Sequence, residues 1–218
     1  MLFVVATPIG NLADITLRAI DTLKQADLIV AEDTRHAGKL LQHYQIKRPA
    51  ISFHQHSSPG QLKQIIDHLQ RGESVALITD AGTPGIADPG QKLVAAAQAA
   101  SVRVVPIPGP SSVTAILSVA GIDTDAFMFV GWLPKKKGRS GFWDELRNLS
   151  VPIVLFESPM RLLRTLQDIK QQLGDDKTVI IGRELTKLHE EVLRLPIPQA
   201  IDHFTQHPPR GEFVIVIT

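Results

Sequence analysis

Residues 79–90 read TDAGTPGIADPG. An apolar run at residues 75–78 precedes this stretch, and an alanine-rich run at residues 93–100 follows it. Runs of this kind are typical of a strand and a helix, so the stretch between them is expected to be a loop. Its glycines allow backbone conformations that a Cβ atom would forbid. Because loops at the carboxyl ends of strands line the ligand crevice of open α/β sheets, we expect this loop to contact a ligand.

The composition of this loop disfavours a phosphate ligand. Pro84 and Pro89 lack the N–H groups that a phosphate cradle uses, and no GxGxxG fingerprint follows the first predicted strand. Exposed carbonyl groups and the carboxylates of Asp80 and Asp88 better suit a ligand with cationic centres or hydroxyl groups, such as a sulfonium nucleoside carrying an amino group. The alternative is an ordinary connection in which Asp88 caps the helix and Pro89 is its first residue. The cap would explain Asp88 but not Asp80.

The amino-terminal half alternates strand and helix signals. Short apolar runs lie at residues 2–6, 28–31, 50–53, 75–78 and 102–105. Helical patterns separate them, so the sequence predicts an α/β fold with a mostly parallel sheet and helices on both faces of that sheet. The loop at residues 7–11, which reads TPIGN, is then expected beside the loop of Asp80.

A proline-rich segment, residues 106–110, is expected to link two α/β lobes, residues 1–110 and residues 111–218. The second lobe has predicted strands at residues 127–130, 153–156, 179–183, 192–195 and 213–217. The segment ELTKLHE between the third and fourth of these strands is too short for a helix, which predicts a hairpin and a mixed sheet.

Two helix starts are predicted in the second lobe. Ser111 or Ser112 is expected to cap a helix over residues 113–120. In the segment FESPMRL, Ser158 is expected to cap a helix that Pro159 opens. Neither cap explains Glu157.

Bulk properties exclude several classes of protein. The 218 residues carry 23 basic and 22 acidic side chains, so any contact with RNA must come from a local patch. The absence of cysteine removes disulfides and thiolate metal sites. The first residues, MLFVVATPIG, lack the features of a signal peptide, and no run approaches the roughly 20 apolar residues needed to span a membrane. We expect a soluble cytoplasmic protein.

The segment AEDTRH follows the second predicted strand and gathers acid, base and cation in one loop. Glu32, Asp33 and His36 are candidates for a general base, and Arg35 for a group that holds a phosphate. The sequence does not rank the three base candidates. The alternative is that Asp33 or Thr34 caps a helix and the remaining side chains face solvent.

The chain has one dense basic run, which consists of Lys135, Lys136, Lys137 and Arg139. With Trp132 nearby, this run is either an RNA-contacting flap or a solvated loop. Histidines 36, 43, 54 and 56 cluster in the sequence but lack the HExxH type of spacing, so no metal site is predicted.

Eight segments occur in the order VATPIGNLADITLRAI, AEDTRH, TDAGTPGIADPG, VVPIPGPSS, GWLPKKKGR, FESPMRL, GRELTKLHEE and RGEFV. In this order the chain resembles the tetrapyrrole methylase superfamily, and within it the ribosomal RNA small subunit methyltransferase I branch. That resemblance implies S-adenosylmethionine as cofactor, bound in a cleft between two α/β lobes. It also implies methyl transfer to the ribose 2′-oxygen of a cytidine in 16S rRNA, and a homodimer.

The pattern and the resemblance together indicate a set of cofactor-binding residues from both lobes. They are Pro8, Gly10, Asp80, Gly82, Thr83, Ile86, Ser111, Ser112, Leu155, Phe156, Arg183 and Gly211. Three other interpretations stay open on the sequence: a tetrapyrrole C-methyltransferase, a non-catalytic rRNA-binding assembly factor, and an enzyme acting on a nucleotide phosphate. The prolines of the Asp80 loop disfavour the last of these.

Overall fold

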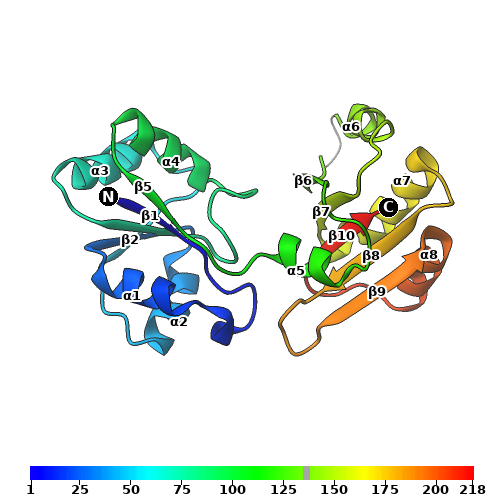
Figure 1. The fold of residues 1–218 in the computed structure, drawn as a ribbon, viewed down its shortest axis with the longest axis horizontal. Helices are drawn as coiled ribbons and strands as arrows, with labels where there is room; N and C mark the ends of the chain where they lie inside the picture. Colours follow the sequence, from blue (N-terminus) through cyan, green and yellow to red (C-terminus); the bar gives the residue numbers. More distant parts are fainter. Residues whose placement is uncertain (135–137) are drawn as a thin grey trace. The chain divides into compact units, whose positions relative to one another are not determined.

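The computed structural model describes residues 1–134 and 138–218 (Figure 1). The chain divides into two compact units, Met1–Ser111 and Ser112–Thr218. Each unit has its own five-stranded sheet and its own buried core. No helix within the described residues is both long enough and apolar enough to cross a membrane.

The first unit is a parallel sheet covered on both faces. Its strands are β1 (Leu2–Val5), β2 (Leu28–Ala31), β3 (Ala50–Ser52), β4 (Val75–Ile78) and β5 (Val104–Ile107), in the order β3-β2-β4-β1-β5. All four pairings are parallel. Every residue of β2 and β4 is buried, as expected for central strands with helices on both sides. The predicted parallel sheet is confirmed.

Helices pack in pairs on the two faces of this sheet, as Figure 1 shows. One face carries α1 (Leu17–Gln25) and α2 (Thr34–His43), and the other carries α3 (Pro59–Gln70) and α4 (Gly90–Ala99). A short 3-10 turn, η1 (Leu12–Asp14), precedes α1. N-cap residues precede three of these helices. Thr16 caps α1, Asp33 caps α2, and Ser58 caps α3 and forms a capping box with Gln61.

The second unit is a mixed sheet, which also confirms the prediction. Its strands are β6 (Met128–Trp132), β7 (Ile153–Glu157), β8 (Thr178–Arg183), β9 (Glu191–Pro196) and β10 (Phe213–Ile217), in the order β6-β7-β10-β8-β9. The β6–β7 pair is parallel, and the other pairs are antiparallel. The predicted hairpin is the pair β8–β9.

The helices of the second unit also cover both faces of its sheet. One core cluster lies under α6 (Arg139–Leu146), α7 (Pro159–Leu173) and α8 (Ile197–Gln206), and the other lies under α5 (Ser112–Val119). Neither α6 nor α8 was predicted from the sequence. Phe204 and Ala200 of α8 are buried, and so is Trp143 of α6. Tertiary packing therefore stabilises both helices.

Several predicted boundaries are wrong by one or two residues, and two of these differences involve a proline. Strand β5 continues through Pro106 because β5 is an edge strand. Leu2 N–H donates to Arg103 O and Ala6 N–H donates to Ile107 O, so the Pro106 nitrogen faces the open edge and no ladder bond is lost. Helix α4 begins at Gly90 with Pro89 as its N-cap, one residue later than predicted.

Candidate functional site

The loops at the carboxyl ends of β1 and β4 are joined, as expected from the sequence. Thr7 N–H donates to Gly82 O (2.9 Å) and Gly82 N–H donates to Thr7 O (3.0 Å), which forms a small antiparallel bridge. The buried Thr7 hydroxyl donates to Thr79 O (3.1 Å). Gly82 has φ +80°, a conformation that favours glycine. The two loops therefore form one continuous surface at this edge of the first sheet.

The loop that follows β2 is tied to the same place by side chains. Thr79 Oγ1 donates to Glu32 Oε2 (2.9 Å), and Asp33 N–H donates to Asp80 Oδ1 (3.2 Å). The loop after β5 is attached through Thr83, whose Oγ1 lies 3.5 Å from Pro110 O. Four loops thus meet at the carboxyl edge of the first sheet, where open α/β sheets bind ligands.

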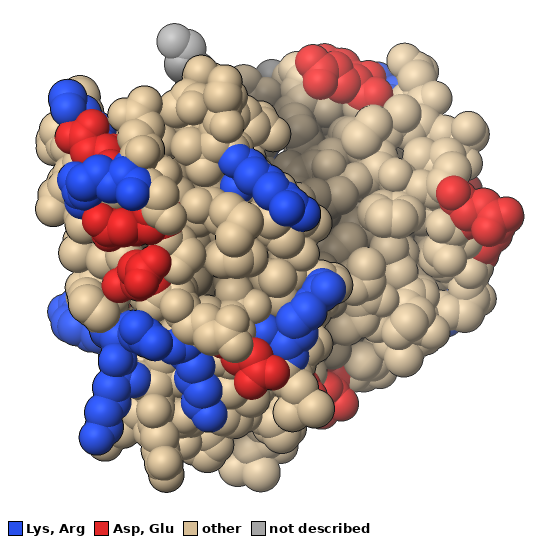
Figure 2. Space-filling model, turned by 60° about the vertical axis from the view of Figure 1, so that its left-hand side comes forward, with Lys and Arg blue, Asp and Glu red and all other residues tan. Residues whose placement is uncertain are grey.

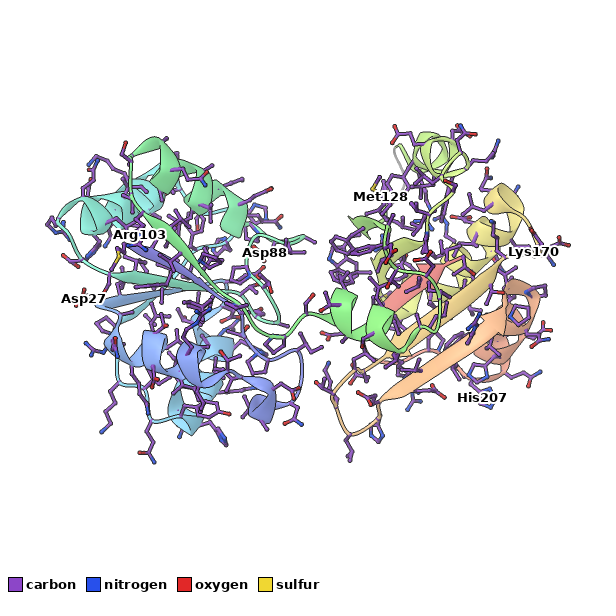
Figure 3. The ribbon with its side chains drawn as sticks, in the orientation of Figure 1. Asp27, Asp88, Arg103, Met128, Lys170 and His207 are labelled. Carbon is purple, nitrogen blue, oxygen red and sulfur yellow. The ribbon has the colours of Figure 1, made fainter. Side chains whose placement is uncertain are left out.

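The Asp80 loop is held in one shape from inside. The Asp88 carboxylate (Figure 3) accepts hydrogen bonds from Gly85 N–H (2.8 Å to Oδ1) and Gly90 N–H (2.7 Å). Asp88 therefore both closes the loop and caps the first N–H of α4, although it is not the formal N-cap. Ala87 has φ +60°, an unusual conformation for a residue with a Cβ atom. Ile86 is half exposed beside it.

The structure separates the base candidates of the AEDTRH segment. The Asp33 side chain accepts from Arg35 Nε (3.1 Å) and Arg35 Nη2 (2.7 Å), and also from Arg35 N–H (2.8 Å) as the helix cap. These hydrogen bonds from the Arg35 side chain and backbone hold the pKa of Asp33 far below its ordinary value. Asp33 is consequently a poor proton acceptor near neutral pH. Glu32 is half-buried under the Thr79 hydroxyl, and His36 is exposed in the first turn of α2.

The remaining residues proposed for the cofactor in this unit differ in accessibility. Gly10 is exposed, whereas Pro8 is buried between the joined loops. Ser111 ends the first unit and Ser112 begins α5, and both are partly buried. Pro8 is thus placed to shape the loop, while Gly10, Asp80 and Ile86 present atoms to solvent.

The candidates in the second unit gather at one edge of the second sheet. Strands β6, β7 and β8 end there, and β10 begins there, because Phe213 is paired with both Glu157 and Arg183. Arg183 Nε donates to Arg210 O (2.8 Å). Gly211, with φ +89°, lies against the Glu184 side chain, and a Cβ atom at Gly211 would lie 2.5 Å from Glu184 Cγ.

An ion-paired cluster fixes this turn. Lys187 Nζ lies 2.9 Å from Glu184 Oε1 and 2.8 Å from Glu212 Oε2. Glu184 Oε1 also accepts from Glu212 N–H (2.9 Å). Burial raises the pKa of Glu184, but the hydrogen bonds from Lys187 and from the Glu212 backbone outweigh it and the pKa is lowered. The close approach at Gly211 is therefore made by Glu184 of the same chain.

Leu155 and Phe156 point to opposite faces of the second sheet. Leu155 is fully buried in the cluster under α7 and α8, so its side chain is not accessible to a cofactor. Phe156 is half-buried on the other face, with its ring centroid 5.0 Å from that of Phe129 and 5.7 Å from that of Trp132. Trp132 is 51% exposed at the end of edge strand β6.

The basic run divides into two parts. Lys135, Lys136 and Lys137 lie outside the described residues. Arg139 is buried, and its guanidinium is bound to Asp168 Oδ2 (2.6 Å), Thr165 Oγ1 (2.9 Å) and Pro134 O (3.1 Å). The predicted contact of Arg139 with RNA is therefore wrong, because its guanidinium is buried and bound within the chain.

A buried polar network around Glu157 was not predicted from the sequence. Glu157 is fully buried and is ion-paired with Arg161 (2.7 Å), one turn further along α7. The signal was present in the sequence, because Arg161, Thr165 and Asp168 recur at spacings that place polar side chains on one helix face.

Charge and metal-ligand patterns single out no further site. On the face shown in Figure 2, basic and acidic side chains are interspersed. Across residues 1–134 and 138–218, no three His, Asp or Glu side chains are grouped so that they could hold a metal ion.

The family is defined by comparison with known proteins. The model described as Tetrapyrrole (Corrin/Porphyrin) Methylases matches residues 1–201, and the chain belongs to this family of methyltransferases. Solved structures agree on the fold: diphthine synthase has a TM-score of 0.75 at 15% identity, covering 99% of this chain and 88% of that one. Uroporphyrin-III-C-methyltransferase from Thermus thermophilus has a TM-score of 0.69 at 16% identity, covering 99% and 93%.

Within the family, the chain is similar to proteins named as ribosomal RNA methyltransferases. The chain is 49% identical to Ribosomal RNA small subunit methyltransferase I of Synechocystis sp. over 218 residues, which cover all of this chain and 78% of that protein. It is 45% identical to the Thermotoga maritima protein of the same name over 217 residues, covering 100% and 97%. The family resemblance stated from the sequence is confirmed, and S-adenosylmethionine is the methyl donor that the family implies.

Proposed function

We propose that this chain transfers a methyl group from S-adenosylmethionine to the ribose 2′-oxygen of a cytidine in 16S rRNA of the small ribosomal subunit. The observation that carries the proposal is identity of 41–49% over essentially the whole chain to relatives named for methylation of small-subunit ribosomal RNA. The tetrapyrrole enzymes among the solved structures share only about a sixth of their residues with it, which supports the fold alone. Family membership also speaks against a non-catalytic assembly factor.

The carboxyl edge of the first sheet fits the cofactor chemically. S-adenosylmethionine supplies an electrophilic methyl group on a positively charged sulfur atom, beside an amino group and ribose hydroxyls. The partly buried Asp80 carboxylate suits those cationic and hydroxyl groups. Gly82 is buried and shapes the loop through its left-handed conformation, and the half-exposed side chain of Ile86 offers an apolar contact. We propose Gly10, Asp80, Gly82, Thr83 and Ile86 as the binding residues of this unit.

The second unit contributes further proposed cofactor residues at its own sheet edge. Phe156 presents a half-buried aromatic ring there, and Arg183 lies beside the start of β10, whereas the close approach at Gly211 is occupied by Glu184 of the same chain. Arg183 donates to a backbone carbonyl and lies 3.6 Å from Glu191, so part of its function is structural. Whether Ser111 and Ser112 contribute is a prediction carried over from the sequence.

Methyl transfer to a ribose hydroxyl needs a group that accepts its proton. Among the candidates, Glu32 and His36 suit this role better than Asp33, whose carboxylate is already saturated by Arg35. Arg35 has a side chain that is 90% exposed, so it is placed to meet an RNA phosphate even while it is paired with Asp33. We propose Glu32 or His36 as the base and Arg35 as the phosphate contact.

RNA binding is proposed for the lysine run, Lys135, Lys136 and Lys137, which would contact the phosphate backbone. The exposed ring of Trp132 at the end of β6 adds a surface on which a nucleobase can stack. The proposal also includes a cytoplasmic location and assembly as a homodimer.

The test is to incubate the purified protein with isotope-labelled S-adenosylmethionine and small ribosomal subunits that lack the modification. Mass mapping of the rRNA should find the label on the ribose of one cytidine. Large ribosomal subunits serve as the control and should stay unlabelled. Label on a base, or label on a porphyrinogen with none on rRNA, would contradict the proposed substrate.

A further inference from the structure

The carboxylate of Glu32 is held by a buried side chain that follows the neighbouring strand. Thr79 comes directly after β4 and is buried, and its Oγ1 donates to Glu32 Oε2 (2.9 Å). Thr79 is itself held from the other side, because the buried hydroxyl of Thr7 donates to Thr79 O (3.1 Å). Glu32 is partly exposed, and among the described residues no donor binds its second oxygen, Oε1. One oxygen of this carboxylate is therefore fixed, and the other is available to a ligand.

A similar pair at the opposite edge of the same sheet provides a comparison. Ser74 precedes β4 and Asp27 precedes β2, and Figure 3 shows Asp27 at the end of the sheet away from Asp88. The Ser74 hydroxyl and N–H both donate to Asp27 Oδ2 (2.7 and 2.8 Å), and Asp27 N–H donates back to Ser74 Oγ (3.1 Å). This pair closes on itself. Within the described residues, Thr79 and Glu32 share a single hydrogen bond, so their pair stays open.

The groups around Glu32 match the parts of the proposed reaction. Asp80, which is proposed for the cofactor, follows Thr79 directly, and its Oδ1 accepts from Asp33 N–H (3.2 Å). Arg35, which is proposed for a phosphate, has a side chain that is 90% exposed. In RNA the 2′-hydroxyl and the 3′-phosphate are attached to adjacent carbons of the ribose. A base for the hydroxyl and a cation for the phosphate are therefore expected close together, as Glu32 and Arg35 are at the end of β2 and the start of α2.

The other remaining base candidate, His36, lacks such a support. It is exposed in the first turn of α2, and no hydrogen bond within the described residues orients its ring. A general base has to be held within hydrogen-bond reach of the proton that it accepts. The structure provides this support for Glu32 through the hydroxyl of Thr79.

We infer that Thr79 is a positioning residue for methyl transfer: its hydroxyl binds Oε2 of Glu32 and so directs Oε1 toward the ribose 2′-hydroxyl. The inference rests on the proposed function and narrows the base to Glu32. In this step the 2′-oxygen forms a bond to the methyl carbon of S-adenosylmethionine as the bond between that carbon and sulfur breaks. The electron pair of the broken bond stays on sulfur, which becomes neutral, and the 2′-hydroxyl proton passes to Glu32 Oε1.

Thr79→Val tests this role because valine keeps the branched shape and removes the hydroxyl, whereas Thr79→Ser keeps the hydroxyl. Methyl transfer to unmodified small ribosomal subunits is measured as a single-turnover rate, together with the KM for the subunit and the Kd for S-adenosylmethionine. We expect Thr79→Val to lower the rate by about 10- to 100-fold, as for a misplaced catalytic group. Thr79→Ser should retain most of the rate. The KM and the Kd should stay close to those of the native protein in both variants.

Ser74→Ala is the matched control. It also removes a hydroxyl that donates to a carboxylate between the ends of β4 and β2, but at the edge away from the site, so the single-turnover rate should be unchanged. Circular dichroism during urea unfolding compares the stability of the variants. A loss of rate that Ser74→Ala shares, or one as large in Thr79→Ser as in Thr79→Val, would assign the effect to packing and overturn the positioning role.

A double-mutant cycle links the hydroxyl to Glu32. Because Glu32→Gln removes the proton acceptor, adding Thr79→Val to it should lower the rate little further, and full additivity would overturn the positioning role. If Thr79→Val does not fold, Thr79→Ser and Thr79→Ala replace it, since these two variants differ only in the hydroxyl and should show the same ratio of rates. A native rate for Glu32→Gln, with label still on the cytidine ribose, would refute the inference and leave the proposed function intact. If the native protein leaves the rRNA unlabelled, the proposed function itself fails.

Discussion

Gly211→Ala should destabilise the second unit strongly, because the glycine serves the fold of this turn. Gly211 has φ +89°, and a Cβ atom there would lie 2.5 Å from both Cγ and Cδ of Glu184. A left-handed conformation costs a residue with a Cβ atom about 1–2 kcal/mol. The clash would also displace Glu184 from Lys187 and from Glu212 N–H, which costs about 1–3 kcal/mol more. The expected loss is about 2–5 kcal/mol.

The assay follows from the position of the tryptophans. Both tryptophans of the chain, Trp132 and Trp143, belong to the second unit, so intrinsic fluorescence during urea unfolding reports on that unit. Gly138→Ala is the matched control in the same unit. It also has positive φ (+82°), but a Cβ atom there would meet no atom of the described residues within 4 Å, so it should cost only the conformational part, about 1–2 kcal/mol.

The double variant Gly211→Ala, Glu184→Ala should be less destabilised than the sum of the single changes, because Glu184→Ala removes the clash. If Gly211→Ala unfolds like the native protein but loses affinity for S-adenosylmethionine, the reasoning is refuted. Gly211 would then be a cofactor-binding residue, as predicted from the sequence.

Other predictions concern the proposed site and the same turn. Asp80→Ala should weaken S-adenosylmethionine binding by about tenfold or more in calorimetry, as expected for loss of a charged contact; an unchanged Kd would remove this residue from the site. Glu32→Gln should lower kcat by about 10²-fold or more if Glu32 is the base. Asp33→Asn should leave most activity, because the Asp33 carboxylate is bound to Arg35. If Asp33→Asn lowers the single-turnover rate more than Glu32→Gln does, Asp33 and not Glu32 is the base. The lowered pKa of Glu184 predicts stability that is complete above about pH 4.5 and is lost as pH falls below it. In Glu184→Gln, that part of the acid-induced loss should disappear from fluorescence-monitored melts.

Patterns that depend on local chemistry were predictable from the sequence. The apolar runs at β2 and β4 coincide with the strands because strands buried on both faces have no polar positions to blur their ends. A cap of α2 at Asp33 or Thr34 was one interpretation of the sequence, and the structure shows that Asp33 is the cap. The meeting of the Thr7 and Asp80 loops followed from the rule that parallel strands end at one edge.

Features that depend on long-range pairing were not predictable. Arg139 was predicted to contact RNA as part of the basic run, and only its hydrogen bonds to Asp168 and Thr165, far along the chain, reveal that it is buried. Gly211 looked like a glycine for a ligand, and only the fold places Glu184 against it. The pairing of Asp33 with Arg35 is local, but the sequence offered no means to rank it above a contact between Arg35 and RNA.

Pro106 has a consequence for how the first unit behaves among other proteins. An open edge strand invites a foreign strand to pair with it, which is a route to aggregation. The nitrogen of Pro106 faces that open edge of β5 and offers no donor, so an incoming strand finds its ladder interrupted in the middle of a four-residue strand. Pro106, which made the end of β5 difficult to predict from the sequence, thus disfavours the addition of another strand to the sheet.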